Sequence, residues 1–145
     1  MYKTDGWTAR ESSSVEMSIN PLAVGVAALA TFLIGGLWYS LLFAKRWQKE
    51  SGVTDEQLKS GAPRIFLGSF LLSLVMAASL AAFIGKEGLV FGIFAGSAAG
   101  LTWIAAAFGI NYLFERKGFI LWLINAGYNV VTFTVMGAII GAIQG

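Results

Sequence analysis

The stretch Gly88–Phe114, GLVFGIFAGSAAGLTWIAAAFGINYLF, contains no Asp, Glu, Lys, Arg or His, and it determines how the rest of the chain is interpreted. Three further stretches share this property and run over about 21–44, 65–84 and 119–143. A helix needs about 20 predominantly apolar residues to cross the hydrocarbon core of a bilayer, so all four are long enough. The sequence therefore predicts an all-α membrane protein in which four transmembrane helices form a compact bundle.

The overall composition agrees with a membrane protein and excludes several kinds of site. Of the 145 residues, 57% are hydrophobic and 12% are charged, against about 25% charged residues in soluble domains. The chain has no cysteine and no histidine, which excludes disulfides, thiolate catalysis and the common zinc and haem ligands. Its cations are scattered and do not form a basic patch. We expect no metal, no cofactor and no nucleic acid, with the lipid bilayer as the first partner.

Residues 1–17 differ in composition from the remainder and are interpreted as a polar N-terminal arm, while residues 18–145 form one transmembrane domain. The arm is not expected to be a signal peptide, because its basic region is weak and the first span is longer than a signal core. Met17 offers an alternative start. Two interpretations stay open: an upstream extension without a role, so that residues 1–16 are absent from the mature protein, or a surface arm that docks on a partner.

Lysine and arginine predict the orientation, because they concentrate in cytoplasmic loops. The loops after the first and the third span contain Lys45, Arg46, Lys49, Lys59, Arg64, Arg116 and Lys117. The other side has only Lys3, Arg10 and Lys86. We therefore expect both termini to be non-cytoplasmic.

The loop after the first span is long enough for a short surface helix. Thr54 can cap its start, and Gln57 follows three residues later, as in a capping box. Gly61 and Pro63 are expected to end it.

Three aromatic residues lie near the cytoplasmic end of the first span. Trp38, Tyr39 and Trp47 fit an interfacial aromatic belt. Simple anchoring is the favoured interpretation, and ligand binding is the alternative.

The sequence also contains a weak internal similarity between spans two and four. The matching residues are Val75, Met76, Ala78, Ala82 and Gly85 against Val135, Met136, Ala138, Ala142 and Gly145. Spans one and three also end alike, with two cations in each case. The chain is therefore a candidate for a parallel duplication of two helical hairpins, although apolar sequences often match by chance.

Regularly spaced glycines form the sharpest motif. Residues four apart lie on one helix face, and this spacing relates Gly88, Gly92, Gly96 and Gly100 in span three, and Gly137, Gly141 and Gly145 in span four. In lipid, small residues let helix backbones approach closely. The motif predicts tight helix packing, either within one chain or, as the alternative, between copies.

Neutral polar residues at membrane depth form the second motif. Spacing of three and four places Asn125, Tyr128, Asn129 and Thr132 on one face of span four. An amide in hydrocarbon needs a partner, so this face should point inward. Interhelical hydrogen bonding is the simpler interpretation, and a polar track for an ion, water or small solute is the other. Asn111 and Tyr112 either cap that track or meet the interface.

Enzyme signatures are missing from the sequence. There is no Ser/His/Asp set, no metal-ligand cluster and no phosphate loop. The spans contain no ionisable residue besides tyrosine, which argues against proton-coupled transport through carboxylates. Glu115 ends span three and is interpreted as a solvated helix end, so we do not expect an enzyme.

Four sequence blocks resemble a bacterial membrane family, domain-of-unknown-function family 1761. The blocks lie at 19–24 (INPLAV), 37–43 (LWYSLLF), 110–116 (INYLFER) and 124–128 (INAGY). Two positions depart from the family pattern: Leu41 replaces an expected proline, and Asn125 replaces a frequent acid. The resemblance covers the chain from about Ser18 and implies a four-helix protein of the bacterial inner membrane, without an assigned activity.

Two functional hypotheses remain. The first is a non-catalytic helix-packing protein that acts as a homo-oligomer or as an accessory subunit of a larger membrane complex. The second is a small channel or carrier for an ion or small neutral solute.

Overall fold

The computed structural model describes residues 18–145, and no strand occurs in that range. The first span consists of α1 and a π-helical segment η1, the second of α4, the third of α5, the π-helical η2 and α6, and the fourth of α7. Their bounds, with those of the two loop helices α2 and α3, are α1 Pro21–Gly36, η1 Leu37–Leu42, α2 Ala44–Ser51, α3 Asp55–Lys59, α4 Ala62–Ile84, α5 Gly88–Ala98, η2 Ala99–Ile104, α6 Ala105–Phe114 and α7 Phe119–Gln144. All four spans are long and apolar enough to cross a membrane.

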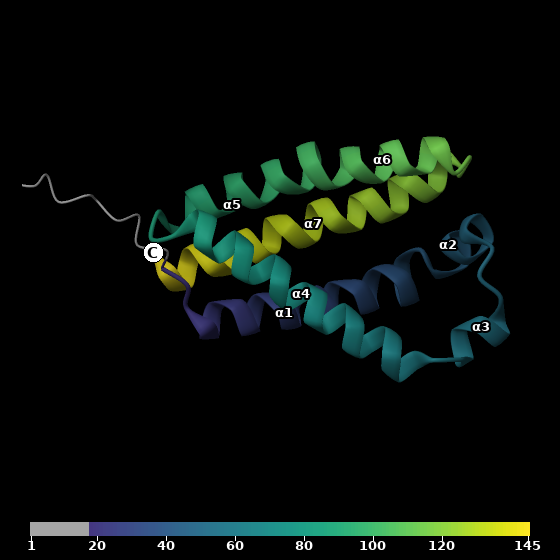
Figure 1. Ribbon diagram of the computed structural model, residues 1–145, viewed down its shortest axis with the longest axis horizontal. Helices are drawn as coiled ribbons and strands as arrows, with labels where there is room; N and C mark the ends of the chain where they lie inside the picture. Colours follow the sequence, from purple (N-terminus) through teal and green to yellow (C-terminus); the bar gives the residue numbers. More distant parts are fainter. Residues whose placement is uncertain (1–17) are drawn as a thin grey trace, which may run out of the picture.

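Helix α7 is the central element of the bundle. Figure 1 shows it running beside α5, η2 and α6 on one side, with α1 on the other, while α4 crosses obliquely. The start of α1 and the end of α7 lie at the same end, where the Asn20 backbone N–H donates to Gln144 Oε1 at 2.8 Å. Helices α2 and α3 lie at the opposite end (Figure 1). The polar loop helices are thus separated from Asn20 and the C-terminus by the length of the bundle.

Local sequence signals explain where several helices begin. The Asn20 side chain caps α1 by accepting from the backbone N–H of Leu22 at 2.9 Å. In α3 the capping box is confirmed: the backbone N–H of Gln57 donates to Thr54 Oγ1 at 3.2 Å, and the backbone N–H of Thr54 donates to Gln57 Oε1 at 2.8 Å. Pro63 lies in the first turn of α4. The expectation that Pro63 ends the loop helix is therefore wrong, since Pro63 begins the next helix instead. The first turn of a helix tolerates proline because the backbone N–H groups there have no partner within the helix.

The first span ends differently from the predicted continuous helix over 21–44. Its last turns are π-helical, and the backbone N–H of Phe43 donates to the Trp38 carbonyl at 2.9 Å. Phe43 itself leaves helical geometry at φ −125° and ψ 12°. Although Leu41 stands where a proline was expected, the helix is still interrupted just after it.

Helices α5 and α7 approach backbone to backbone along their glycines. A methyl group at Gly96 would lie 2.8 Å from the Phe133 carbonyl carbon, and one at Gly137 would lie 2.9 Å from the Gly92 carbonyl carbon. Ordinary contacts of this kind are 3.4 Å or longer. The glycine faces of spans three and four therefore meet within one chain, where no larger side chain fits.

The remaining core consists mainly of small and medium apolar residues. Its fully buried members from α1, α4 and α7 are Ala23, Ala27, Ala77, Ala81, Ile84, Met136 and Ile140. Alanine-lined faces let α1 and α4 pack closely, as small residues do in membrane bundles.

The two hairpins pack differently. The glycine contact is made between α5 and α7, and in α4 the methyl position of Gly68 has no atom within 4 Å. The π-helical segments also fall at different places, at the end of span one and in the middle of span three. The predicted duplication of two hairpins is tested by neither observation and stays a prediction.

Candidate functional site

Asn125 joins three spans at the half of the bundle that carries the loop helices. Its Oδ1 accepts a hydrogen bond from the Tyr39 hydroxyl at 2.7 Å, and its Nδ2 donates to the Tyr112 hydroxyl at 2.7 Å. Tyr39 belongs to η1 and Tyr112 to α6, so the amide of α7 bridges spans one and three. Both oxygen and nitrogen of the amide are satisfied, as a polar group at this depth requires.

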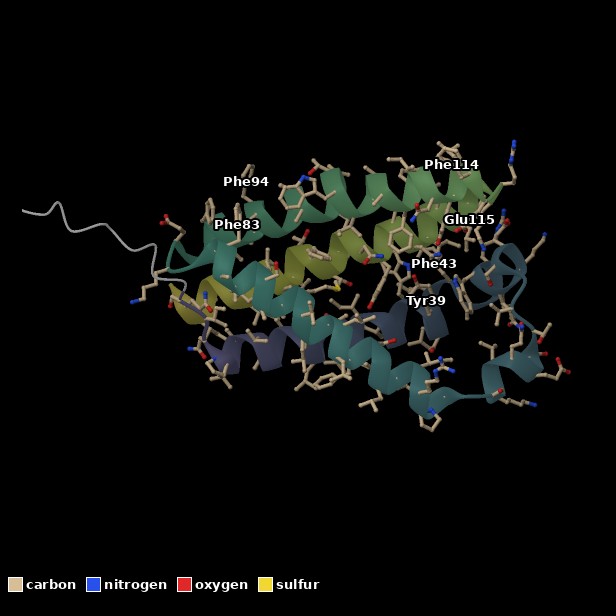
Figure 2. The ribbon with its side chains drawn as sticks, viewed as in Figure 1. Tyr39, Phe43, Phe83, Phe94, Phe114 and Glu115 are labelled. Carbon is tan, nitrogen blue, oxygen red and sulfur yellow. The ribbon has the colours of Figure 1, made fainter. Side chains whose placement is uncertain are left out.

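Tyr128, one turn further along α7, extends this cluster toward α1. Its hydroxyl donates to the Thr31 carbonyl at 3.2 Å. Its ring centroid lies 5.1 Å from that of Tyr39 in an edge-on arrangement. We call Tyr39, Tyr112, Asn125 and Tyr128 the tyrosine–asparagine cluster. Figure 2 shows Tyr39 and Phe43 between η1 and α7, where this cluster lies.

Trp38 and Tyr39 both hydrogen-bond to α7. Trp38 is half-buried, and its indole N–H donates to the Ile124 carbonyl at 2.9 Å. The Tyr39 hydroxyl donates to Asn125 Oδ1, and the Tyr39 ring packs edge-on against the Trp47 ring, with 5.6 Å between the ring centroids. The polar atoms of Trp38 and Tyr39 thus bond to α7 within the bundle, and their role as interfacial anchors stays a prediction.

Glycines receive the large aromatic side chains of this region. A methyl group at Gly35 would lie 3.3 Å from the Tyr128 hydroxyl, and one at Gly127 would lie 3.2 Å from Trp38 Cζ2. Thus Tyr128 of α7 packs against Gly35 of α1, and Trp38 of η1 packs against Gly127 of α7.

An aromatic side chain packed against a glycine also joins α6 and α7. The Trp122 indole donates to the Ala105 carbonyl at 2.9 Å and passes beside Gly109, whose methyl position is 3.1 Å from Trp122 Nε1.

The other predicted polar-track residues do not join the cluster. Asn129 Nδ2 donates to the Asn125 carbonyl of its own helix at 2.8 Å. Thr132 is fully buried, and its hydroxyl has no hydrogen-bond partner among the described residues. Asn111 is exposed on the outer side of α6, and placing it in the track is therefore wrong. Adjacent residues of a helix point about 100° apart, so Tyr112 faces inward and Asn111 does not.

Gln144 is a second polar anchor that the sequence analysis missed. Its Nε2 donates to the Ala81 carbonyl at 3.1 Å and to the Gly85 carbonyl at 2.8 Å, while its Oε1 accepts from the Asn20 backbone N–H. The side chain is 8% exposed. A lone glutamine at the end of an apolar span was the available signal.

The four side chains of the cluster are neutral, and the Lys117 ammonium lies over the Tyr112 ring, 6.0 Å from its centroid. Glu115 is exposed at the end of α6, near the outward-pointing Phe114 (Figure 2). No group of three His, Cys, Asp or Glu side chains within residues 18–145 is arranged to hold a metal ion. The cluster therefore offers neutral hydrogen-bonding and aromatic surfaces.

Two apolar grooves open on the surface of the bundle, each of about 490 Å³. One lies between α4 and the α5–η2 part of span three, and its members include Ser79, Phe83, Phe94, Ala98 and Thr102. We call it the span groove. The other lies between α2, α3 and the start of α4 and is lined by Trp47, Val53, Gln57, Leu58, Ala62, Ile65 and Phe66. We call it the loop groove. Neither groove is lined by Asn125, Tyr128, Asn129 or Thr132.

Four apolar spans joined by internal hydrogen bonds define a helical bundle compatible with a multi-pass membrane protein. The chain belongs to the family described as protein of unknown function DUF1761, whose sequence profile matches residues 22–141. The resemblance inferred from the four sequence blocks is thereby confirmed. No curated protein and no solved structure significantly matches the chain.

Proposed function

We propose that this protein is a non-catalytic, multi-pass protein of the bacterial inner membrane, with both termini non-cytoplasmic, that packs against other membrane helices. It acts either as a homo-oligomer or as an accessory subunit of a larger membrane complex. The observation that carries the proposal is that Asn125 and Tyr128, the polar side chains of the predicted track that bond between spans, do so within a single chain. A bundle closed in this way supports a packing role better than an open polar pathway.

The glycine faces do not support self-association, because α5 and α7 use them against each other. The span groove is the better candidate surface. It is lined by the small residues Ala95, Ala98 and Ala99 and by Phe83 and Phe94, which are exposed on α4 and α5 (Figure 2). Small residues beside exposed aromatic side chains suit the close approach of a further helix.

Disulfide cross-linking in native membranes tests this proposal, because the chain has no cysteine of its own. Ser79→Cys and Thr102→Cys each place one thiol in the span groove. Leu33→Cys and Leu113→Cys are matched controls, exposed on α1 and α6 outside both grooves. A homo-oligomer would give a dimer band for the groove variants and not for the controls.

An accessory subunit would instead leave a reproducible larger complex after mild solubilisation, identified by mass spectrometry of the purified assembly. A chain that runs as a lone monomer in mild detergent and in nanodiscs, with no cross-link from either groove position, would contradict both forms of the proposal.

A small channel or carrier is the second candidate, and the buried Thr132 hydroxyl favours it. A buried polar atom without a partner is rare in a packed interior, and within residues 18–145 neither the Thr132 hydroxyl nor the Asn129 amide has a hydrogen-bond partner on another helix. Solute flux into liposomes that is lost in Asn129→Leu, but kept in Asn111→Leu on the outer surface, would support transport. Equal flux in empty and protein-containing liposomes would reject it.

A further inference from the structure

The loop groove lies where the polar loop helices meet the first turns of a membrane span. Ile65 and Phe66 of α4 form one wall, and Leu58 of α3 and Trp47 of α2 form the others. Leu58, Ile65 and Phe66 are 48%, 58% and 61% exposed. Leu58 is the one apolar residue of the five-residue helix α3. An exposed apolar side chain on a polar helix favours surroundings that are apolar on one side and polar on the other. The boundary between headgroups and acyl chains has this character.

Cations flank the lining residues along the chain. Lys59 follows Leu58, and Arg64 precedes Ile65. Within residues 18–145 the one ion pair is Arg46–Glu50, at 2.9 Å, so neither Lys59 nor Arg64 has a carboxylate within 4.0 Å there.

The acids near the groove do not cancel this charge. Over residues 44–64 five cations face three carboxylates, which are Glu50, Asp55 and Glu56. Glu50 is paired with Arg46, and Asp55 accepts a hydrogen bond from Gln48 at 2.6 Å. Glu56 is exposed, and it is the one carboxylate of this segment without such a contact to a described residue. The segment 44–64, with five cations and three carboxylates, therefore keeps a net charge of +2, and Lys59 and Arg64 are next to groove-lining residues in the sequence.

Gln57 adds a directed donor at the same place. Its Oε1 is held by the Thr54 backbone N–H in the capping box, which fixes the side chain at the start of α3. Its Nε2 makes no hydrogen bond to a described residue and can donate to an oxygen of a bound molecule.

We propose that the loop groove binds one anionic phospholipid. An acyl chain lies against Trp47, Leu58 and Ile65, and the phosphate is held by Lys59 and Arg64, with Gln57 donating to a phosphate or ester oxygen. The apolar wall and the cations that neighbour it in the sequence match the two halves of such a lipid. Basic sites beside transmembrane helices bind anionic headgroups in this way, and each nearby cation contributes about a fivefold gain in affinity. The inference does not depend on the packing function proposed above.

Native mass spectrometry of the full chain in neutral detergent tests the proposal with two lipids of identical acyl chains. Phosphatidylglycerol is expected to give one retained molecule per chain at concentrations where phosphatidylcholine gives none. The Lys59→Gln/Arg64→Gln variant should weaken phosphatidylglycerol binding about 25-fold, at about fivefold for each cation. The matched control is Arg116→Gln/Lys117→Gln, which removes the same charge from the short loop before α7 and should bind as the unmodified chain does.

A further variant, Ala62→Trp, fills the groove without changing charge and should abolish the retained lipid. Equal retention of both lipids by the unmodified chain would overturn the proposal, and this comparison needs no variant to fold. Equal losses in the two double variants would also overturn it, because the effect would then be nonspecific. A protein segment that occupies the groove and is not displaced by phosphatidylglycerol would overturn it as well.

Discussion

The Tyr39 hydroxyl donates to Asn125 Oδ1 at 2.7 Å, although the two residues are 86 positions apart in the sequence. The same amide donates through Nδ2 to Tyr112. One neutral side chain thereby fixes the rotation of three spans relative to one another. Because lipid offers no competing hydrogen bonds, each of these contacts specifies which face of its helix turns inward.

Tyr39→Phe is expected to destabilise the folded protein by about 1 kcal/mol, because Asn125 Oδ1 loses its partner at membrane depth. Adding Asn125→Leu to this variant should cost less than Asn125→Leu alone, with a coupling of about 0.6 kcal/mol. Unfolding equilibria in detergent measure all three variants. Thr102→Val, whose hydroxyl bonds to Ala98 of its own helix on the exposed side, is the control. Strictly additive effects would mean that the two side chains do not interact.

Gly96→Ala is expected to cost about 3 kcal/mol or more, because a methyl group 2.8 Å from the Phe133 carbonyl carbon must force α5 and α7 apart. Gly68→Ala, in the interior of α4 with no atom within 4 Å of its methyl position, should not destabilise the protein. Thermal unfolding of both variants in the same detergent gives the comparison. Similar stability of the two variants would show that the glycine contact does not limit helix approach.

Gln144→Leu is expected to cost about 2 kcal/mol, since it removes three hydrogen bonds and leaves the Asn20 N–H and the Gly85 carbonyl without this partner. The exposed neighbour Ala142→Leu should be near neutral. Hydrogen exchange gives a local readout: the Asn20 amide should exchange faster in Gln144→Leu only. An unchanged Asn20 exchange rate would contradict the hydrogen bond to Gln144.

Thr132→Val tests whether the buried hydroxyl has a function. If the hydroxyl is unpartnered, as in the structure, its removal without a change of shape should stabilise the protein by about 1 kcal/mol. Thr134→Val, which loses a bond to Val130 and the contact with Ser97 at 2.9 Å, should destabilise it instead. A loss of stability in Thr132→Val would contradict an unpartnered hydroxyl, and the same loss in a Tyr128→Phe background would favour a bound water or ion over a bond to Tyr128.

Part of the candidate site was predictable because the polar residues of span four are few. The spacing of Asn125, Tyr128 and Thr132 indicated an inward face, and all three are at least half-buried. The partners on other helices could not be predicted, since Tyr39 and Thr31 carry no local signal of where α7 will pass. The contact of the Trp38 ring with Gly127 of α7 could not be predicted either, because it depends on which face of α7 turns toward span one.

The sequence by itself determined the number of spans, their approximate limits, the capping box at Thr54, the close-packing glycines as a motif and the family. These follow from local properties: the length of uncharged stretches, the spacing of small residues and the chemistry of helix caps. Only the tertiary structure decided that α5 and α7 use their glycines on each other, that Tyr112 and not Asn111 faces inward, and that Gln144 ties the end of α7 to α1 and α4. The physical reason is that these helices are apolar on nearly every side. Hydrophobic periodicity therefore leaves their rotation undetermined, and contacts between distant residues decide it.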